Sequence, residues 1–231
     1  MAVRCLRAIV ALCCLCVTAQ SEAADLRRVE VDVAIVLAVD VSGSIQEPEW
    51  VLQKDGYAEA FRNPQVLEAI KRGFIGTIAV TMVQWADDRQ HKQVIPWTLI
   101  GDEYSARRFS DAILMSPRES LGSNTYIQTG IRFSIELLNT LPFDAMRRVI
   151  DVSGDGTTNG LTIDLEKVRK EAAEQHITIN GLPILEEVPN LDVYYKTSVI
   201  AGPGAFMVVA KDFESFAVAV HRKLLLEIAS R

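Results

Sequence analysis

Five oxygen-bearing side chains in three separate stretches of the chain have the chemistry to hold a hard metal ion. They are Asp40, Ser42, Ser44, Thr125 and Asp155. Carboxylate and hydroxyl oxygens suit Mg²⁺ or Mn²⁺, whereas soft-metal sites need thiolate or imidazole ligands, and no cysteine or histidine lies near these positions in the sequence. The sequence therefore predicts a site for Mg²⁺ or Mn²⁺, provided that the fold gathers the three stretches.

The elements around these residues can bring them to one edge of a sheet. Residues 31–39 are almost all apolar and β-branched, which is typical of a strand covered on both faces of a parallel sheet. Residues 149–152 repeat the pattern just before Asp155, and the loop 122–124 leads into a helix that begins near Thr125. Ligands of open α/β sheets bind beyond the carboxyl ends of the strands. We therefore expect the three stretches to converge there.

Strand-like and helix-like patterns alternate along the rest of the chain. The polar stretch 87–90 between the expected strands 76–85 and 93–99 predicts a hairpin. This alternation predicts one α/β domain with a doubly wound, mostly parallel central sheet, one antiparallel edge strand and helices on both faces. The expected strands are residues 76–85, 93–99, 177–185 and 205–210, and the expected helices are residues 47–62, 66–72, 102–115, 125–141, 164–175, 191–198 and a closing helix from 212.

The first 24 residues differ from the rest of the chain. Arg4 and Arg7 precede the apolar stretch 8–19, and small residues follow up to Ala24. This order predicts a cleavable secretory signal over residues 1–24, the alternative being a buried N-terminal helix. The apolar stretch is too short for a stable membrane anchor.

Residues 25–231 contain no cysteine, because all four cysteines lie in the predicted signal. The processed chain would therefore have no disulfide, and it also lacks an Asn-x-Ser/Thr acceptor site. Together these features favour a bacterial protein that is periplasmic or secreted. The formal net charge of -6 makes nucleic acid and anionic membranes poor partners.

The site residues and their order resemble the metal-ion-dependent adhesion site of the von Willebrand factor A family. The resemblance rests on Asp-x-Ser-x-Ser at residues 40–44, on Thr125 with the later pair Thr129-Gly130, and on Asp155-Gly156. It extends from about Val31 to the closing helix. More closely, the chain resembles an uncharacterised group of bacterial exported proteins of that family. The resemblance implies a von Willebrand A-like domain over residues 25–231.

The resemblance also implies how the site would work. The hydroxyls of Ser42, Ser44 and Thr125 would bind the metal directly, while Asp40 and Asp155 would act directly or through bound water. A partner protein would then place a Glu or Asp carboxylate in the remaining coordination position. The implied function is an exported, metal-dependent protein-binding module of adhesion type with no catalytic residues, and nothing in the residues identifies its partner.

Two other functions are alternatives. A metal-dependent phosphohydrolase could use Asp40 as its nucleophile, but dehalogenase-like phosphatases would need a second Asp at position 42, where the chain has Ser, and no general base is evident. A subunit of a chelatase-type multiprotein complex is the second, although its ATP-driven partner would be cytoplasmic. Ser153 and Thr157 are candidates for orienting the metal ligands, with a turn role as the simpler interpretation.

Overall fold

The computed structural model describes residues 28–230, apart from the side chain of residue 162. The predicted signal over residues 1–24 lies outside the described residues. Within the described range, no helix combines the length and the apolar character that crossing a membrane requires.

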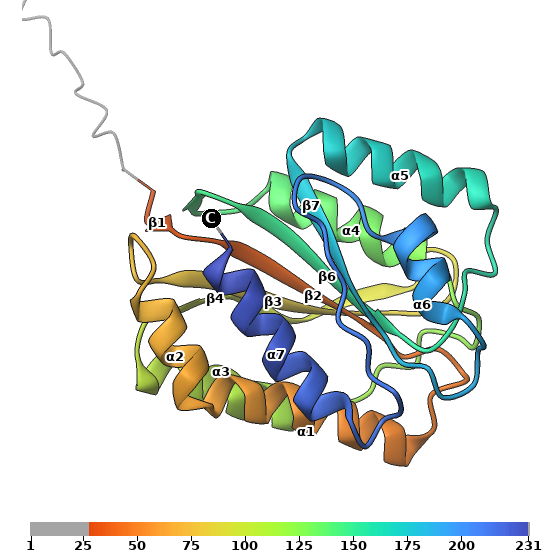
Figure 1. Ribbon diagram of the computed structural model, residues 1–231, viewed down its shortest axis with the longest axis horizontal. Helices are drawn as coiled ribbons and strands as arrows, with labels where there is room; N and C mark the ends of the chain where they lie inside the picture. The colour runs from red at the N-terminus through yellow and green to blue at the C-terminus, as the bar shows by residue number, and fades with distance from the viewer. Residues whose placement is uncertain (1–27, 231) are drawn as a thin grey trace, which may run out of the picture.

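A five-stranded sheet in the order β4-β3-β2-β6-β7 forms the middle layer (Figure 1). Its members β2 (Ala34–Asp40), β3 (Ile78–Trp85), β6 (Arg148–Gly154) and β7 (Ile177–Pro183) run parallel, while β4 (His91–Ile100) pairs with β3 in antiparallel fashion. Every residue of β2 is buried, as its continuous apolar sequence predicted, because helices cover both faces of the strand. The predicted sheet with its antiparallel edge is confirmed.

One face of the sheet carries four helices, which pack on Ile35, Leu37 and Val39 of β2. They are α1 (Glu47–Arg62), α2 (Pro64–Lys71), α3 (Glu103–Met115) and α7 (Phe216–Ala229). The boundaries of two of them follow local chemistry. Helix α1 has Pro48 in its first turn, where the missing N–H removes no helical hydrogen bond. At the start of α3, Asp102 Oδ1 accepts a hydrogen bond from the backbone N–H of Ser105 at 2.7 Å.

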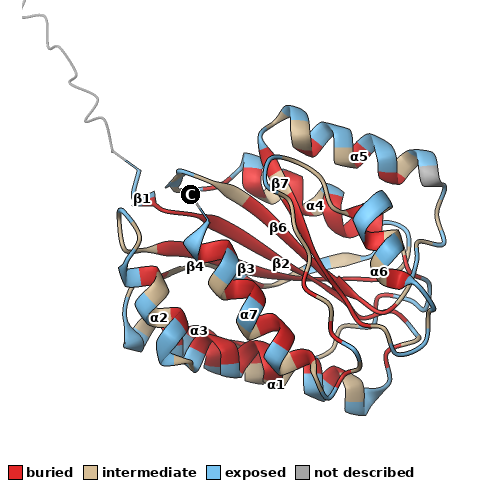
Figure 2. Cartoon of the chain, in the orientation of Figure 1, coloured by how far each residue is buried: buried red, intermediate tan, exposed pale blue. Residues whose placement is uncertain are grey.

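The opposite face packs on Ala34, Val36 and Ala38, the alternate side chains of β2. It carries α4 (Ile127–Asn139), α5 (Thr162–Glu174), the short α6 (Leu191–Tyr194) and the π-helical turn η1 (Tyr195–Val199) that continues it. Figure 2 shows the sheet buried between the two helix layers, with exposed residues along the outer sides of the helices. The predicted doubly wound arrangement is therefore confirmed.

The strand expected over residues 31–39 is interrupted. Its first part is β1 (Glu30–Val31), which pairs with β5 (Asp144–Ala145) in a separate two-stranded sheet. The break follows from Asp32, whose carboxylate accepts hydrogen bonds from three successive backbone N–H groups, those of residues 75–77.

Two further expectations near the C-terminus were wrong. Residues 205–210 form only isolated bridges beside β7, because the side chain of Asn180 accepts the backbone N–H of Phe206 at 2.9 Å and so replaces a ladder bond. The closing helix begins at Phe216 and not at residue 212, because Asp212 and Ser215 close a local turn first, with Asp212 Oδ1 accepting the Ser215 N–H at 2.8 Å.

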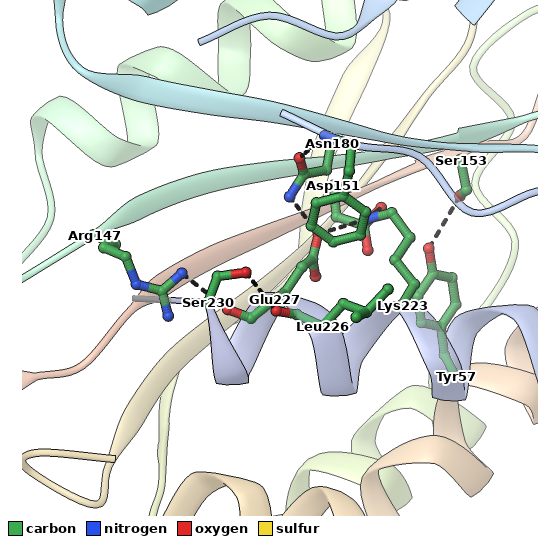
Figure 3. A network of polar contacts seen from close by, with 10 residues as sticks. Tyr57, Arg147, Asp151, Ser153, Asn180, Lys223, Leu226, Glu227 and Ser230 are labelled. Atoms are coloured by element: carbon green, nitrogen blue, oxygen red, sulfur yellow. Dashed lines mark hydrogen bonds and ion pairs between the residues drawn. The ribbon is translucent and has the colours of Figure 1, made fainter. Parts of the chain in front are cut away.

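A buried ionic cluster fastens α7 to the sheet (Figure 3). Lys223 Nζ lies 2.5 Å from Asp151 Oδ1 on β6 and 2.5 Å from Glu227 Oε1 on its own helix, and all three side chains are buried. Asn180 on β7 donates a hydrogen bond to Glu227 Oε1 at 3.0 Å, and Arg147 donates to the Glu227 carbonyl oxygen at 2.9 Å. The position of α7 therefore depends on polar as well as apolar contacts.

The two ends of the described chain emerge at the same edge of the sheet. Figure 1 shows β1 and the end of α7 side by side, at the edge where β2 begins. Hydrogen bonds support this view, because Asp144 N–H donates to Val29 O at 3.0 Å and Arg147 donates to Ile228 O at 3.3 Å.

The carboxyl ends of β2 and β6 lie at the opposite edge. From β2 the chain passes to β3 on one side, whereas β6 lies on the other side of β2, so the strand order reverses between β2 and β6. Such a switch point leaves a crevice between the strand ends, which is where ligands of open α/β sheets bind. Asp40 is the last residue of β2, and Asp155 directly follows β6.

Candidate metal site

The structure brings the five predicted residues together at the switch point. Thr125 Oγ1 donates a hydrogen bond to Ser42 Oγ at 3.1 Å, and Ser42 Oγ lies 3.3 Å from Ser44 Oγ. Ser44 Oγ donates to Asp155 Oδ1 at 2.9 Å, and the backbone N–H of Ser42 donates to Asp40 Oδ1 at 2.8 Å. Three hydroxyls and two carboxylates from distant parts of the sequence therefore form one connected group.

The two carboxylates are poorly solvated. Asp40 is 0% exposed and Asp155 is 2% exposed, and no described residue is a hydrogen-bond partner of Asp40 Oδ2. Burial, and then the nearby charge of Asp155, raise the pKa of Asp40 to about 8. Burial also raises the pKa of Asp155. Because a bound cation stabilises the ionised form of a carboxyl group, it would reverse both shifts.

The turn that carries Ser42 and Ser44 is held by the loop between α3 and α4. Arg118 Nη2 donates hydrogen bonds to the carbonyl oxygens of Val41 and Ser42, at 3.2 and 3.0 Å. Gly43 N–H donates to Ser123 O at 3.0 Å, and a Cβ at Gly43 would come within 2.8 Å of the Ser123 Cβ. Only glycine allows the two loops to approach this closely.

Gln84, a fully buried residue of β3, fixes the part of that loop that carries Arg118. Its side-chain Nε2 donates to Pro117 O at 2.9 Å, and its Oε1 accepts the Glu119 N–H at 2.8 Å. The sheet thus sets the position of Arg118 through a neighbouring strand.

Thr125 is held from the other side by the loop that follows β6. Asn159 Oδ1 accepts the Thr125 N–H at 2.6 Å, and the Asn159 N–H donates to Thr125 O at 2.7 Å. Next to it, Thr158 Oγ1 donates to Gln128 Oε1 at 2.6 Å. A Cβ at Gly156 would lie 3.3 Å from Thr125 Oγ1, so this glycine leaves room beside the hydroxyl.

Sequence reasoning missed Arg118 and Asn159. Asn159 lies in a polar turn after a strand, which is a visible signal for a loop near the site but not for this contact. Arg118 gave no signal. Of the two residues considered for orienting the ligands, Ser153 accepts a hydrogen bond from Tyr57 at 3.1 Å (Figure 3), and Thr157 is exposed. No hydrogen bond joins either of them to the described site side chains.

The donor set fits a hard divalent cation. It consists of hydroxyl and carboxylate oxygens, and one buried carboxylate oxygen has no partner within the described structure. Residues 28–230 contain no group of three or more His, Cys, Asp or Glu side chains arranged to hold a metal. A metal at this position would therefore depend on Ser42, Ser44 and Thr125 as well as on the two aspartates.

Comparisons with solved structures identify the fold. A von Willebrand factor type A structure from Catenulispora acidiphila matches with a TM-score of 0.60 and 15% identity, over 86% of this chain and 43% of that one. Proximal thread matrix protein 1 from the mussel byssus, with a zinc occupied MIDAS motif, matches at 0.58 and 16%, over 87% and 49%. The manganese-loaded Plasmodium vivax TRAP protein matches at 0.54 and 14%, over 86% and 73%.

The chain spans less than half the length of the first two of these structures. At such identities, the likeness shows the fold alone, and the fold is that of von Willebrand A domains. No curated protein matches the chain. Residues 30–231 match the model of a family described as "Protein of unknown function (DUF1194)", and the chain therefore belongs to that family.

Proposed function

We propose that this chain is a metal-dependent protein-binding module of adhesion type. Asp40, Ser42, Ser44, Thr125 and Asp155 hold Mg²⁺ or Mn²⁺ at the edge of the sheet. The observation that carries the proposal is the convergence of these five residues at the switch point between β2 and β6, with the buried Asp40 Oδ2 left without a partner among the described residues. The zinc occupied and manganese-loaded structures of the same fold support it.

The site would recognise an acidic group. Ser42, Ser44 and Thr125 bind the ion as uncharged ligands, so that much of its positive charge remains unbalanced. Asp40 and Asp155 bind it directly or orient its water molecules. With an ion held by these residues, a Glu or Asp carboxylate on a partner protein would complete its coordination. Among the similar structures, the pilus adhesin SpaC from Lactobacillus rhamnosus GG is consistent with such a binding role.

The same proposal includes export. Residues 1–24 are removed as a signal, and residues 25–231 act in the periplasm or outside the cell. The support is the order of charged, apolar and small residues at the start of the sequence. N-terminal sequencing of the processed protein should begin at or close to Asp25, and an intact N-terminus would contradict this part.

The geometry does not favour the phosphohydrolase alternative. A nucleophilic carboxylate must reach the substrate directly, whereas Asp40 is 0% exposed. The chelatase-type alternative requires an ATP-driven partner, which the proposed export would exclude. A phosphate ester hydrolysed at a rate that depends on Asp40 would favour the enzyme over the binding module.

Metal titration and partner capture test the proposal. Calorimetry with Mn²⁺ and Mg²⁺ should show binding to the wild-type protein and strongly reduced binding to Asp40→Ala and Thr125→Ala. Thr140→Ala is a matched control, because within the described structure this exposed hydroxyl bonds only the carbonyl oxygens of Glu136 and Leu137 in α4. Capture of an envelope protein in Mg²⁺ should be reversed by EDTA. Full-strength metal binding and capture by both site variants would contradict the proposal.

A further inference from the structure

Tyr195 places a buried hydroxyl beside Asp40. The side chain is 0% exposed, and no described residue is a hydrogen-bond partner of its hydroxyl. A Cβ built on Gly154 would lie 3.0 Å from Tyr195 Oη and 2.8 Å from Asp40 Oδ2. Tyr195 Oη and Asp40 Oδ2, which both lack a partner among the described residues, therefore border the same space next to Gly154 at the end of β6.

Two glycines on neighbouring strands make room for this tyrosine. Because Gly154 on β6 has no Cβ, the space between the Tyr195 hydroxyl and Asp40 stays open. A Cβ at Gly181 on β7 would come within 2.8 Å of Tyr195 Cδ1. Tyr195 also begins the π-helical turn η1, in which the Ile200 N–H donates to Tyr195 O at 3.0 Å. Single π-helical turns are rare and occur frequently at functional sites.

A purely apolar role does not explain the hydroxyl. A phenylalanine ring would fill the same space, whereas a buried hydroxyl that forms no hydrogen bond lowers the stability of the fold. Asp40 Oδ2 is the matching acceptor, because Asp40 Oδ1 already accepts the Ser42 N–H. A carboxylate oxygen has two lone pairs, so Oδ2 can accept from Tyr195 and still face a cation or its water.

We propose that Tyr195 is a positioning residue of the site: its hydroxyl donates to Asp40 Oδ2, directly or across one water molecule, and fixes the orientation of that carboxylate. Ser42 holds one oxygen of Asp40 and Tyr195 holds the other, so the carboxylate has a single orientation when a metal binds. Groups that orient metal ligands in this way affect metal affinity strongly. The effect on metal binding rests on the proposed function, whereas the contact itself rests on the geometry.

The first test measures Mn²⁺ affinity in Tyr195→Phe, which removes only the hydroxyl. We expect a loss of roughly tenfold to a hundredfold relative to wild type. Tyr57→Phe is the matched control, because Tyr57 is also buried but its hydroxyl bonds Ser153. An affinity within about twofold of wild type in Tyr195→Phe, or an equal loss in Tyr57→Phe, would overturn the positioning role.

The second test needs no metal. Thermal unfolding in EDTA is measured for Tyr195→Phe, Asp40→Asn and the double variant, and the changes in melting temperature should be clearly non-additive if the two groups are in contact. Additive changes would overturn the contact. If wild type binds no Mn²⁺ while the changes are non-additive, the proposed function and the positioning role both fail and the Tyr195–Asp40 contact stands.

Discussion

At the scale of single residues, Asp40 has two carboxylate oxygens in different surroundings. Oδ1 accepts a backbone N–H of its own turn, while Oδ2 faces the space above Gly154. The three hydroxyls beside it carry no charge, while burial, and then the charge of the second acid Asp155, raise the pKa of Asp40. The chemistry of the site therefore depends on how firmly a few loop residues fix these oxygens.

Arg118 offers a direct test of that dependence. We expect Arg118→Met to weaken Mn²⁺ binding about tenfold, because the carbonyl oxygens of Val41 and Ser42 lose their common donor and the turn becomes free to move. Lost hydrogen bonds to a half-buried charged group should also lower the free energy of unfolding by about 1 to 3 kcal/mol.

Calorimetry and chemical denaturation measure the two effects. Arg107→Met is the control, since the only ion pair of this exposed side chain among the described residues is with Glu103 on its own helix. Arg118→Lys should recover part of the affinity, because an ammonium group can donate to the same carbonyl oxygens. Unchanged Mn²⁺ affinity in Arg118→Met would show that the guanidinium has no positioning role.

At the scale of elements, α7 is joined to β6 by the buried cluster of Lys223, Asp151 and Glu227. Lys223→Met would leave two buried carboxyl groups without their cation, and we expect it to lower the free energy of unfolding by about 3 to 5 kcal/mol. Asp151→Asn should cost much less, because the pair of Lys223 and Glu227 remains. Urea unfolding of both variants checks the order, and equal losses would contradict this account of the cluster.

The same cluster predicts a pH dependence. Burial, followed by the charge of Glu227, raises the pKa of Asp151 from 3.8 to about 7, although Lys223 acts in the opposite direction. Between these values the folded protein keeps a proton that the unfolded chain releases. The stability that Asp151 contributes should therefore decrease as the pH rises from about 4 to about 7, by at most about 1.4 kcal/mol per pH unit.

Urea unfolding at several pH values measures this slope in wild type and in Asp151→Asn. Asp40 and Asp155 also have raised pKa values, so the informative quantity is the difference between the two proteins. The Asn variant should show the shallower decrease. Parallel curves would mean that Asp151 ionises in the folded protein much as it does in the unfolded chain.

Features that depend on the pattern of a single element could be predicted from the sequence, whereas features that depend on long-range contacts could not. The candidate ligands were predictable because Asp40 and Asp155 follow apolar strands and Thr125 precedes an amphipathic helix, and such patterns depend on local sequence. The break at Asp32 was not predictable, because it depends on backbone N–H groups more than forty residues away. The same holds for residues 205–210, where a side chain of β7 takes the place of a ladder partner.

The residues that support the site could not be predicted either, because their roles also depend on contacts with distant parts of the sequence. Arg118 and Asn159 reach the site from two different loops and Tyr195 from the π-helical turn η1, and the groups near them are distant in the sequence. Tyr195 in particular reads as an ordinary core residue of a short helix. Its position is evident only from the structure, in which Gly154 on β6 and Gly181 on β7 make room for it beside the π-helical turn.

At the scale of the whole molecule, metal binding should raise the free energy of unfolding and therefore the Tm. A ligand that binds only the folded protein adds about 2.7 kcal/mol at a concentration 100 times its Kd. For a chain of this size that corresponds to a rise in Tm of roughly 5 to 10 °C. We expect this rise with Mn²⁺ or Mg²⁺, its reversal by EDTA, and no rise in Asp40→Ala. An equal rise in the variant would place the binding elsewhere.

The positions of the two ends of the described chain have a practical consequence for binding experiments on this molecule. Val29 and Ile228 lie at the edge where β2 begins, and the five site residues lie where β2 ends. A fused domain or a biosensor surface attached to either end would therefore lie at the edge of the sheet opposite the site. The edge that carries the five site residues then points outward, so a large partner could bind there without steric hindrance from the attachment.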